Sequence, residues 1–63
     1  MIIEKLEVLQ QNMNDIAGSW NGDEDTFYYA GSQYHESDAV DAEVIATKAG
    51  ELIKLIKAYE EED

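Results

Sequence analysis

Apolar residues recur every three or four positions at both ends of the chain, which is the spacing of a helix with one buried side. In the first segment the interval alternates between four and three residues. The apolar positions of this segment are Ile2, Leu6, Leu9, Met13, Ile16 and Trp20. Polar residues fill most of the other positions, and Gly18 is a suitable C-terminal stop. We therefore predict an amphipathic helix over residues 2–18.

A second helix is predicted over residues 37–61, where Ser37 or Asp38 can cap the N-terminus. Its main apolar stripe consists of Ala42, Ile45, Ala49, Leu52, Ile56 and Tyr59. A second apolar edge consists of Val40, Val44, Ile53 and Leu55. Because this helix is apolar over more than one narrow seam, we expect it to contact two neighbours.

The width of that apolar surface predicts self-association. We expect a homodimer in which two helical hairpins form a four-helix bundle, with Ala49 and Gly50 as candidates for the closest crossing. A chain of 63 residues without cysteine cannot add a disulfide to a marginal core. Packing between helices or between copies is therefore the expected source of stability.

The connection between the helices, residues 20–36, is long for two packed helices. It opens with a turn-forming stretch at residues 21–25 and continues with aromatic and β-branched residues around Ala30-Gly31. A short β-hairpin with Phe27 opposite Tyr34 is one interpretation, and an irregular loop is the other. We thus predict a single domain over residues 1–63. Its class is all-α, helix–long loop–helix, with a minor β contribution if the hairpin forms.

The charge is strongly one-sided, with fifteen acids, four lysines, no arginine and a net charge of −11. Direct binding to nucleic acid or to an anionic membrane is not expected, because both need clustered basic residues. The apolar run at the start is too short for a signal peptide, and we expect a cytoplasmic protein. Four acids end the chain at the negative end of the helix dipole, which predicts a frayed tail at residues 62–63.

Catalytic and metal-binding patterns are weak, and we expect neither an enzyme nor a cofactor. Asn21, Asp23 and Asp25 match the first alternating ligands of a calcium-binding EF-hand loop. Thr26 then stands where that loop needs glycine, and Ser32 where it needs glutamate. His35 lies near two serines, but no nucleophile-elbow glycines accompany them. A metal-binding helix–loop–helix remains the third-ranked interpretation.

The stretch from Asp23 to Glu43 is the candidate partner-binding surface. It holds seven acids, no lysine and four of the six aromatic residues. Carboxylates around aromatic anchors suit a basic protein groove. The predicted partner-binding residues are Asp23, Glu24, Asp25, Tyr28, Tyr29, Tyr34, Glu36, Asp38, Asp41 and Glu43.

In composition alone the chain is similar to small inhibitors encoded by phages and mobile elements, including anti-CRISPR proteins and DNA mimics. This resemblance implies an antagonist that occupies a basic groove of a target protein, such as one that holds nucleic acid. The alternative is a structural or antitoxin-like adaptor built as an acidic helical dimer. A pull-down from the native host separates the two hypotheses, because a nuclease, polymerase or defence complex as partner supports the antagonist and a structural subunit supports the adaptor.

Overall fold

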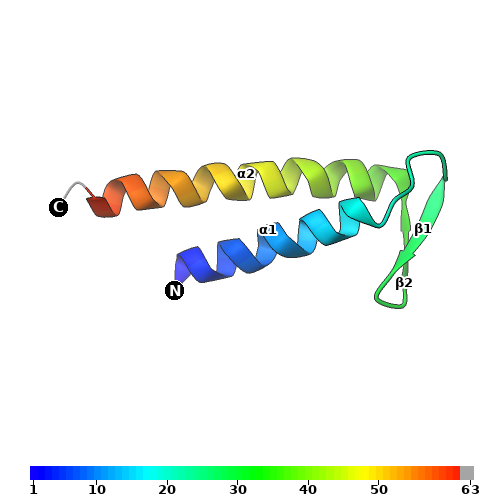
Figure 1. The fold of residues 1–63 in the computed structure, drawn as a ribbon, viewed down its shortest axis with the longest axis horizontal. Coiled ribbons are helices and arrows are strands. Elements are labelled where there is room, and N and C mark those ends of the chain that lie inside the picture. Colours follow the sequence, from blue (N-terminus) through cyan, green and yellow to red (C-terminus); the bar gives the residue numbers. More distant parts are fainter. Residues whose placement is uncertain (62–63) are drawn as a thin grey trace.

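The computed structural model describes residues 1–61 and consists of two long helices joined through a β-hairpin (Figure 1). Helix α1 is Ile2–Gly18 and helix α2 is Glu36–Glu61, with strands β1, Thr26–Tyr29, and β2, Ser32–His35, between them. The two helices run antiparallel, and the hairpin stands at the end where α1 finishes and α2 begins (Figure 1). The predicted tail at residues 62–63 lies outside the described residues.

The predicted helical hairpin is confirmed, and of the two interpretations of its connection the structure has the β-hairpin. The first helix has the predicted bounds, whereas the second begins one residue earlier than predicted, at Glu36. The molecule is elongated, with principal extents of 48 × 19 × 12 Å. An elongated molecule of this size has a large surface and buries few residues.

Helix α1 ends without the left-handed glycine that often closes a helix. Gly18 is the last helical residue, and Ser19 follows as C-cap with a right-handed φ of −80°. The Ser19 hydroxyl donates a hydrogen bond to the carbonyl oxygen of Asp15 at 2.9 Å, and the Ser19 amide donates to the same oxygen at 3.1 Å. The Asp15 carbonyl thus accepts a second hydrogen bond from the Ser19 side chain at this helix end.

Small residues line the side of α2 that faces α1. The buried positions of α2 follow a spacing of three and four residues, namely Ala39, Ala42, Ala46, Ala49 and Ile53. Alanine side chains let two helices approach closely, and the Gln10 side chain of α1 reaches across this interface. Its Nε2 donates a hydrogen bond to the carbonyl oxygen of Ala46 at 3.4 Å.

This arrangement corrects the predicted stripe of α2. Ile45, Leu52 and Tyr59 were expected to be buried, but they are 42%, 47% and 67% exposed. Ala49 and Gly50, the candidates for the closest helix crossing, lie at the contact with α1 of the same chain. The physical reason is that α2 has several apolar edges, and α1 packs most closely against the edge with the smallest side chains.

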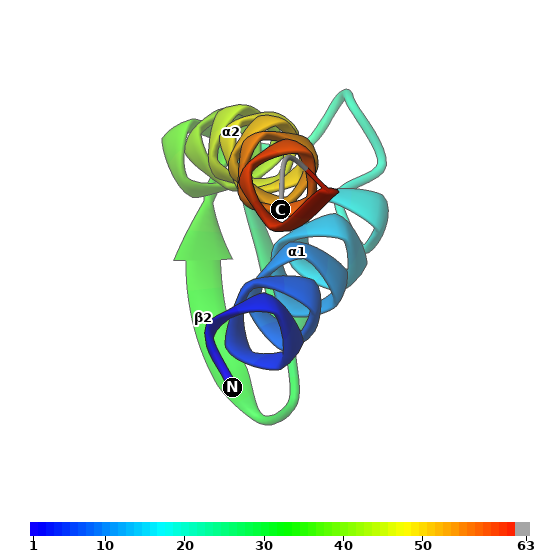
Figure 2. The ribbon, with the colours of Figure 1, turned by 90° about the vertical axis from the view of Figure 1, so that its left-hand side faces the viewer.

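The best-buried cluster lies at the hairpin end of the molecule. Ile16, Phe27, Ala39 and Ala42 form its centre. Met13, Ala17, Trp20, Tyr29 and Tyr34 pack around them. In the view along the helix axes, the hairpin extends from the start of α2 and lies alongside α1 on one side of the molecule (Figure 2). The hairpin thus serves as a third layer over one end of a two-helix core.

Candidate functional site

The hairpin has the register that the sequence predicted. Phe27 pairs with Tyr34 and Thr26 pairs with His35, around a two-residue turn at Ala30-Gly31. Both turn residues have positive φ, 52° for Ala30 and 82° for Gly31, as in a type I′ turn. This turn fixes which side chains face the helices and which face away.

Two of the three tyrosines assigned to the partner-binding surface belong to the core of the isolated chain. Tyr34 stacks on Phe27 with ring centroids 5.6 Å apart, and Tyr29 meets Tyr34 edge-on at 6.4 Å. Both tyrosines are half-buried against the helices. Tyr28 points to the opposite face of the hairpin and is 71% exposed. Of the three, Tyr28 is therefore the tyrosine most available to a partner.

The acidic loop before the hairpin is held by contacts to its backbone carbonyls and by one contact to a carboxylate, in which the Asn21 Nδ2 donates a hydrogen bond to the Glu24 Oε1 at 3.3 Å. The Trp20 indole donates a hydrogen bond to the carbonyl oxygen of Glu24 at 2.7 Å. The Glu36 amide donates to the carbonyl oxygen of Asp25 at 3.0 Å, which ties the loop to the start of α2. Asp23, Glu24 and Asp25 are all exposed. Their negative charge consequently faces solvent from an ordered loop.

Asp38 stabilises the first turn of α2. Its Oδ2 accepts a hydrogen bond from the His35 amide at 2.8 Å, and the His35 Nδ1 lies 3.7 Å from the same oxygen. His35 directly precedes the helix, so this contact is the half of a capping box in which the N3 side chain reaches back to the N-cap amide. The sequence predicted Ser37 or Asp38 as the N-cap residue. In the structure Asp38 does cap the helix, but it lies in the first turn and accepts the hydrogen bond from the amide of His35, the residue before the helix.

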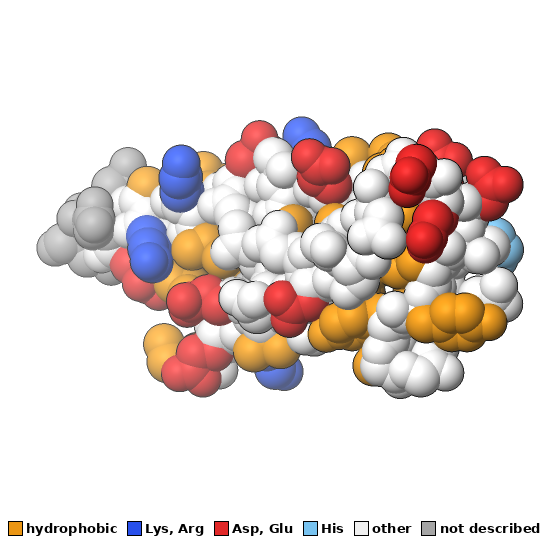
Figure 3. Space-filling model, turned by 45° about the vertical axis from the view of Figure 1, so that its right-hand side comes forward, with side chains coloured by type: hydrophobic (Ala, Val, Ile, Leu, Met, Phe, Trp, Pro, Cys, Tyr) orange, Lys and Arg blue, Asp and Glu red, His pale blue; other side chains and the backbone are white. Residues whose placement is uncertain are grey.

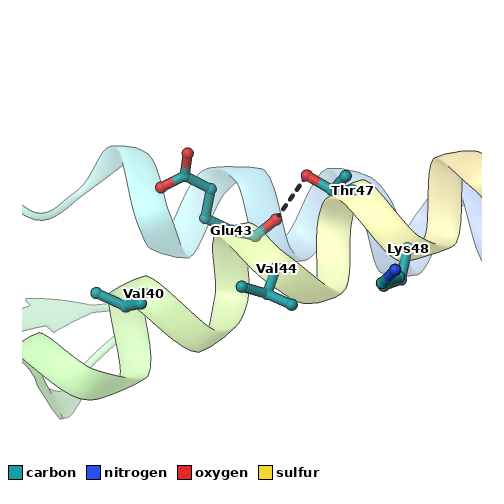
Figure 4. A pocket seen from close by; sticks show the side chains of 5 residues that line it. All are labelled: Val40, Glu43, Val44, Thr47 and Lys48. Carbon is teal, nitrogen blue, oxygen red and sulfur yellow. Dashed lines mark hydrogen bonds between the residues drawn. The ribbon is translucent and has the colours of Figure 1, made fainter.

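The remaining acids of the predicted surface lie on different sides of α2. Asp38 and Asp41 border a shallow hollow of about 280 Å³, whose other walls include Tyr34, Met13 and Ile16. Glu43 borders a groove of about 240 Å³ on the outside of α2, together with Val40, Val44, Thr47 and Lys48 (Figure 4). The Thr47 hydroxyl donates a hydrogen bond to the carbonyl oxygen of Glu43 at 3.1 Å, which fixes the Thr47 side chain along the helix.

The acidic residues therefore surround one end of the molecule instead of forming one flat face. We call this set the acidic end: Asp23, Glu24, Asp25, Glu36, Asp38, Asp41 and Glu43. All seven are exposed. Figure 3 shows acidic side chains crowded at the end that carries the histidine, with the lysines farther along the molecule. The nearest lysine along α2 is Lys48, and it pairs with Glu51 at 3.4 Å.

The described residues show no cluster of metal ligands and only open hollows. Within residues 1–61 no three His, Asp or Glu side chains gather closely enough to hold a metal. The hollows are open depressions on the surface, one of them formed by residues of α2 alone. Such shallow sites do not enclose a substrate as an active-site pocket does.

The sequence predicted an apolar surface on α2 beyond the contact with one helix, but not which residues of the two helices stay exposed. They are Ile2, Val8 and Leu9 on α1, and Val40, Val44, Ile45, Leu52, Leu55 and Tyr59 on α2. The width of the apolar pattern on α2 was the available signal, but it did not indicate which edge would stay open.

In the described part of the chain, neither helix has the length and apolar character needed to cross a lipid bilayer. Comparisons of the chain with protein families, with curated proteins and with solved structures find no match. The proposal for its function therefore rests on the geometry and charge described above.

Proposed function

We propose that the protein is a non-catalytic binding module whose acidic end occupies a basic groove of a target protein and blocks it. A groove that normally holds nucleic acid is the type of target that this charge pattern fits best. The observation that carries the proposal is the acidic end itself, seven exposed carboxylates with no lysine between Asp23 and Glu43. Such a concentration of like charge opposes folding of a small domain, so a functional benefit accounts for its retention.

The order of the hairpin end supports recognition rather than simple solubility. The loop acids are anchored through Trp20 and Glu36, and Asp38 is fixed by the His35 amide. A loop whose backbone is held in place loses little conformational freedom when a partner binds, which favours affinity. Tyr28 lies exposed beside them on the outer face of the hairpin and supplies a contact that salt does not screen.

Charge and aromatic contacts make separable contributions. Neutralising Asp41 and Glu43 together is expected to slow association with the target and to reduce its salt dependence. Replacing Tyr28 with alanine is expected to speed dissociation instead. Asp38 is a poor choice for this test, because its loss also removes a helix cap.

The experiment is an affinity capture from native host extract, followed by binding kinetics with the captured protein. The matched control neutralises Glu4 and Glu7, two exposed acids of α1 far from the hairpin. A basic target that loses affinity with the Asp41/Glu43 variant but not with the Glu4/Glu7 variant supports the proposal. Duplex DNA or RNA that competes for the target identifies the groove as one for nucleic acid.

The second candidate function is a structural or antitoxin-like adaptor that works as a helical dimer. The exposed apolar residues along α2 favour it, since they are suited to assembly rather than to a basic groove. A captured partner that binds equally well after the Asp41/Glu43 and Tyr28 substitutions would contradict the antagonist and support the adaptor.

A further inference from the structure

The loop that follows α1 contains an asparagine directly before a glycine. Asn21 and Gly22 are both exposed and lie outside the helices and strands. The chain has two further asparagines, Asn12 and Asn14, which are exposed as well but lie within α1. Exposure alone therefore does not distinguish Asn21 from the other two. The residue that follows it and the backbone around it do.

The amide nitrogen of Gly22 is unobstructed. Glycine has no Cβ beside this nitrogen, and a Cβ at position 22 would meet nothing within 4 Å. Within residues 1–61 no backbone hydrogen bond engages the Gly22 amide. The residues that follow Asn12 and Asn14 lie inside a helix instead, where backbone amides donate to carbonyl oxygens of the preceding turn. Only Asn21 is therefore followed by an accessible and unbonded amide.

The side chain of Asn21 is held weakly. Its Nδ2 donates a hydrogen bond to the Glu24 Oε1 at 3.3 Å, which is long for a contact of this kind, and the bond is exposed to solvent. Such a bond contributes little to stability, because water replaces it readily. The side-chain carbonyl carbon of Asn21 is consequently able to turn towards the nitrogen of Gly22.

We propose that Asn21 is a site of spontaneous deamidation, through which the protein gains a carboxylate in its acidic loop. The Gly22 amide nitrogen attacks the Asn21 Cγ atom, and the new N–Cγ bond closes a succinimide ring. The Cγ–Nδ2 bond breaks, and Nδ2 leaves as ammonia together with the proton that the Gly22 amide loses. Water then opens the ring at one of its two carbonyls and gives aspartate or isoaspartate. The steps together consume one water and release one ammonia.

The product alters the loop in which it forms. A carboxylate at position 21 cannot donate to Glu24, and it adds a negative charge beside Asp23 and Glu24, where like charges repel. Isoaspartate also lengthens the main chain by one methylene group between Trp20 and Gly22. The Trp20 indole donates to the Glu24 carbonyl oxygen at 2.7 Å, so its fluorescence reports on the geometry of the loop. We expect this fluorescence to change as the protein ages.

This inference does not rest on the proposed function, because the reaction needs only Asn21, Gly22 and water. It does bear on measurements of target binding, since aged protein carries one more carboxylate beside the seven of the acidic end. An Asn21→Gln variant keeps the charge constant in such measurements.

Mass spectrometry of protein incubated in warm, mildly alkaline buffer tests the proposal. Deamidation raises the mass of the chain by about one dalton and adds a negative charge. Trypsin cleaves after lysine, and one fragment, residues 6–48, contains all three asparagines, so their reaction is compared within one peptide. We expect Asn21 to react at least about tenfold faster than Asn12 or Asn14, because only Asn21 precedes glycine and lies outside a helix.

Two variants serve as controls. Asn21→Gln retains an amide but needs a larger, more slowly formed ring, so it should keep its mass and its Trp20 fluorescence while the natural chain changes. Freshly prepared Asn21→Asp should elute from an anion exchanger together with the aspartate form of the aged natural chain. A charged product that elutes elsewhere and retains the Asn21 amide would contradict the assignment.

An aged natural chain in which Asn21 stays intact would overturn the proposal, and so would equal rates at the three asparagines. The same incubation in urea provides the comparison with an unfolded chain. Reaction of Asn21 in urea but not in the folded protein would overturn the proposal as well, because the loop would then protect the side chain. Circular dichroism before and after incubation confirms that the chain reacted while folded.

Discussion

Gln10 of α1 lies directly over Gly50 of α2, so that a Cβ at position 50 would stand 2.7 Å from the Gln10 Nε2 atom. The same nitrogen donates a hydrogen bond to the carbonyl oxygen of Ala46 at 3.4 Å. A glycine inside a long helix costs about 1 kcal/mol relative to alanine. At this position the cost is offset by room for a polar contact between the helices.

This relationship predicts a non-additive pair of substitutions. Gly50→Ala alone should stabilise the fold by less than about 1 kcal/mol, because the new methyl group displaces the Gln10 amide. In a Gln10→Ala background the same change should give the full gain. Urea unfolding of the four variants measures the coupling between the two sites. Equal effects of Gly50→Ala in both backgrounds would show that the two residues do not interact.

The hairpin turn predicts a stabilising substitution. Ala30 has a φ of 52°, a left-handed conformation that costs an L-residue with a Cβ about 1 kcal/mol or more. Asparagine is preferred before glycine in a type I′ turn, so Ala30→Asn should raise stability by roughly 0.5–1 kcal/mol. Gly31→Ala places a Cβ at a φ of 82° and should lower stability. Thermal unfolding monitored by circular dichroism compares them. An Ala30→Asn variant that melts at a lower temperature would contradict the turn type.

Replacing Asp38 and replacing Asp41 with alanine remove the same charge from α2 but are expected to change the stability of the fold differently. Asp38→Ala removes the acceptor for the His35 amide and should cost about 1 kcal/mol, as the loss of a helix cap does. Asp41→Ala removes one charge from the acidic end without removing that cap, so stability should be unchanged or higher. The difference between their urea midpoints is the measurement. Equal midpoints would mean that the Asp38 contact has no net effect.

Added salt should stabilise the protein, because the seven carboxylates of the acidic end repel one another and lack lysines nearby. Urea unfolding at low and at high sodium chloride concentration tests this dependence. Neutralising Asp23, Glu24 and Asp25 together should reduce the dependence, whereas neutralising Glu4, Glu7 and Glu51 should reduce it less. An equal reduction in both variants would show that net charge matters and its location does not.

The sequence by itself determined the two helices, and it determined the register that the connection would have if it formed a hairpin. Helix periodicity gave α1 its bounds, and the Ala30-Gly31 turn gave the hairpin its register, with Phe27 opposite Tyr34. The alternation along the strand also placed Tyr28 on the outer face, where it is exposed. These features depend on neighbours in the chain, so local spacing is enough to predict them. The uneven charge is likewise a property of composition.

Only the tertiary structure decided which side of each element is buried. Helix α2 is apolar over a wide arc, and periodicity could not choose between the alanine edge and the edge with Ile45, Leu52 and Tyr59. Close packing with α1 selected the alanines and left the larger side chains exposed. The same packing drew Tyr29 and Tyr34 into the core. These outcomes depend on contacts between distant segments, which no local spacing contains.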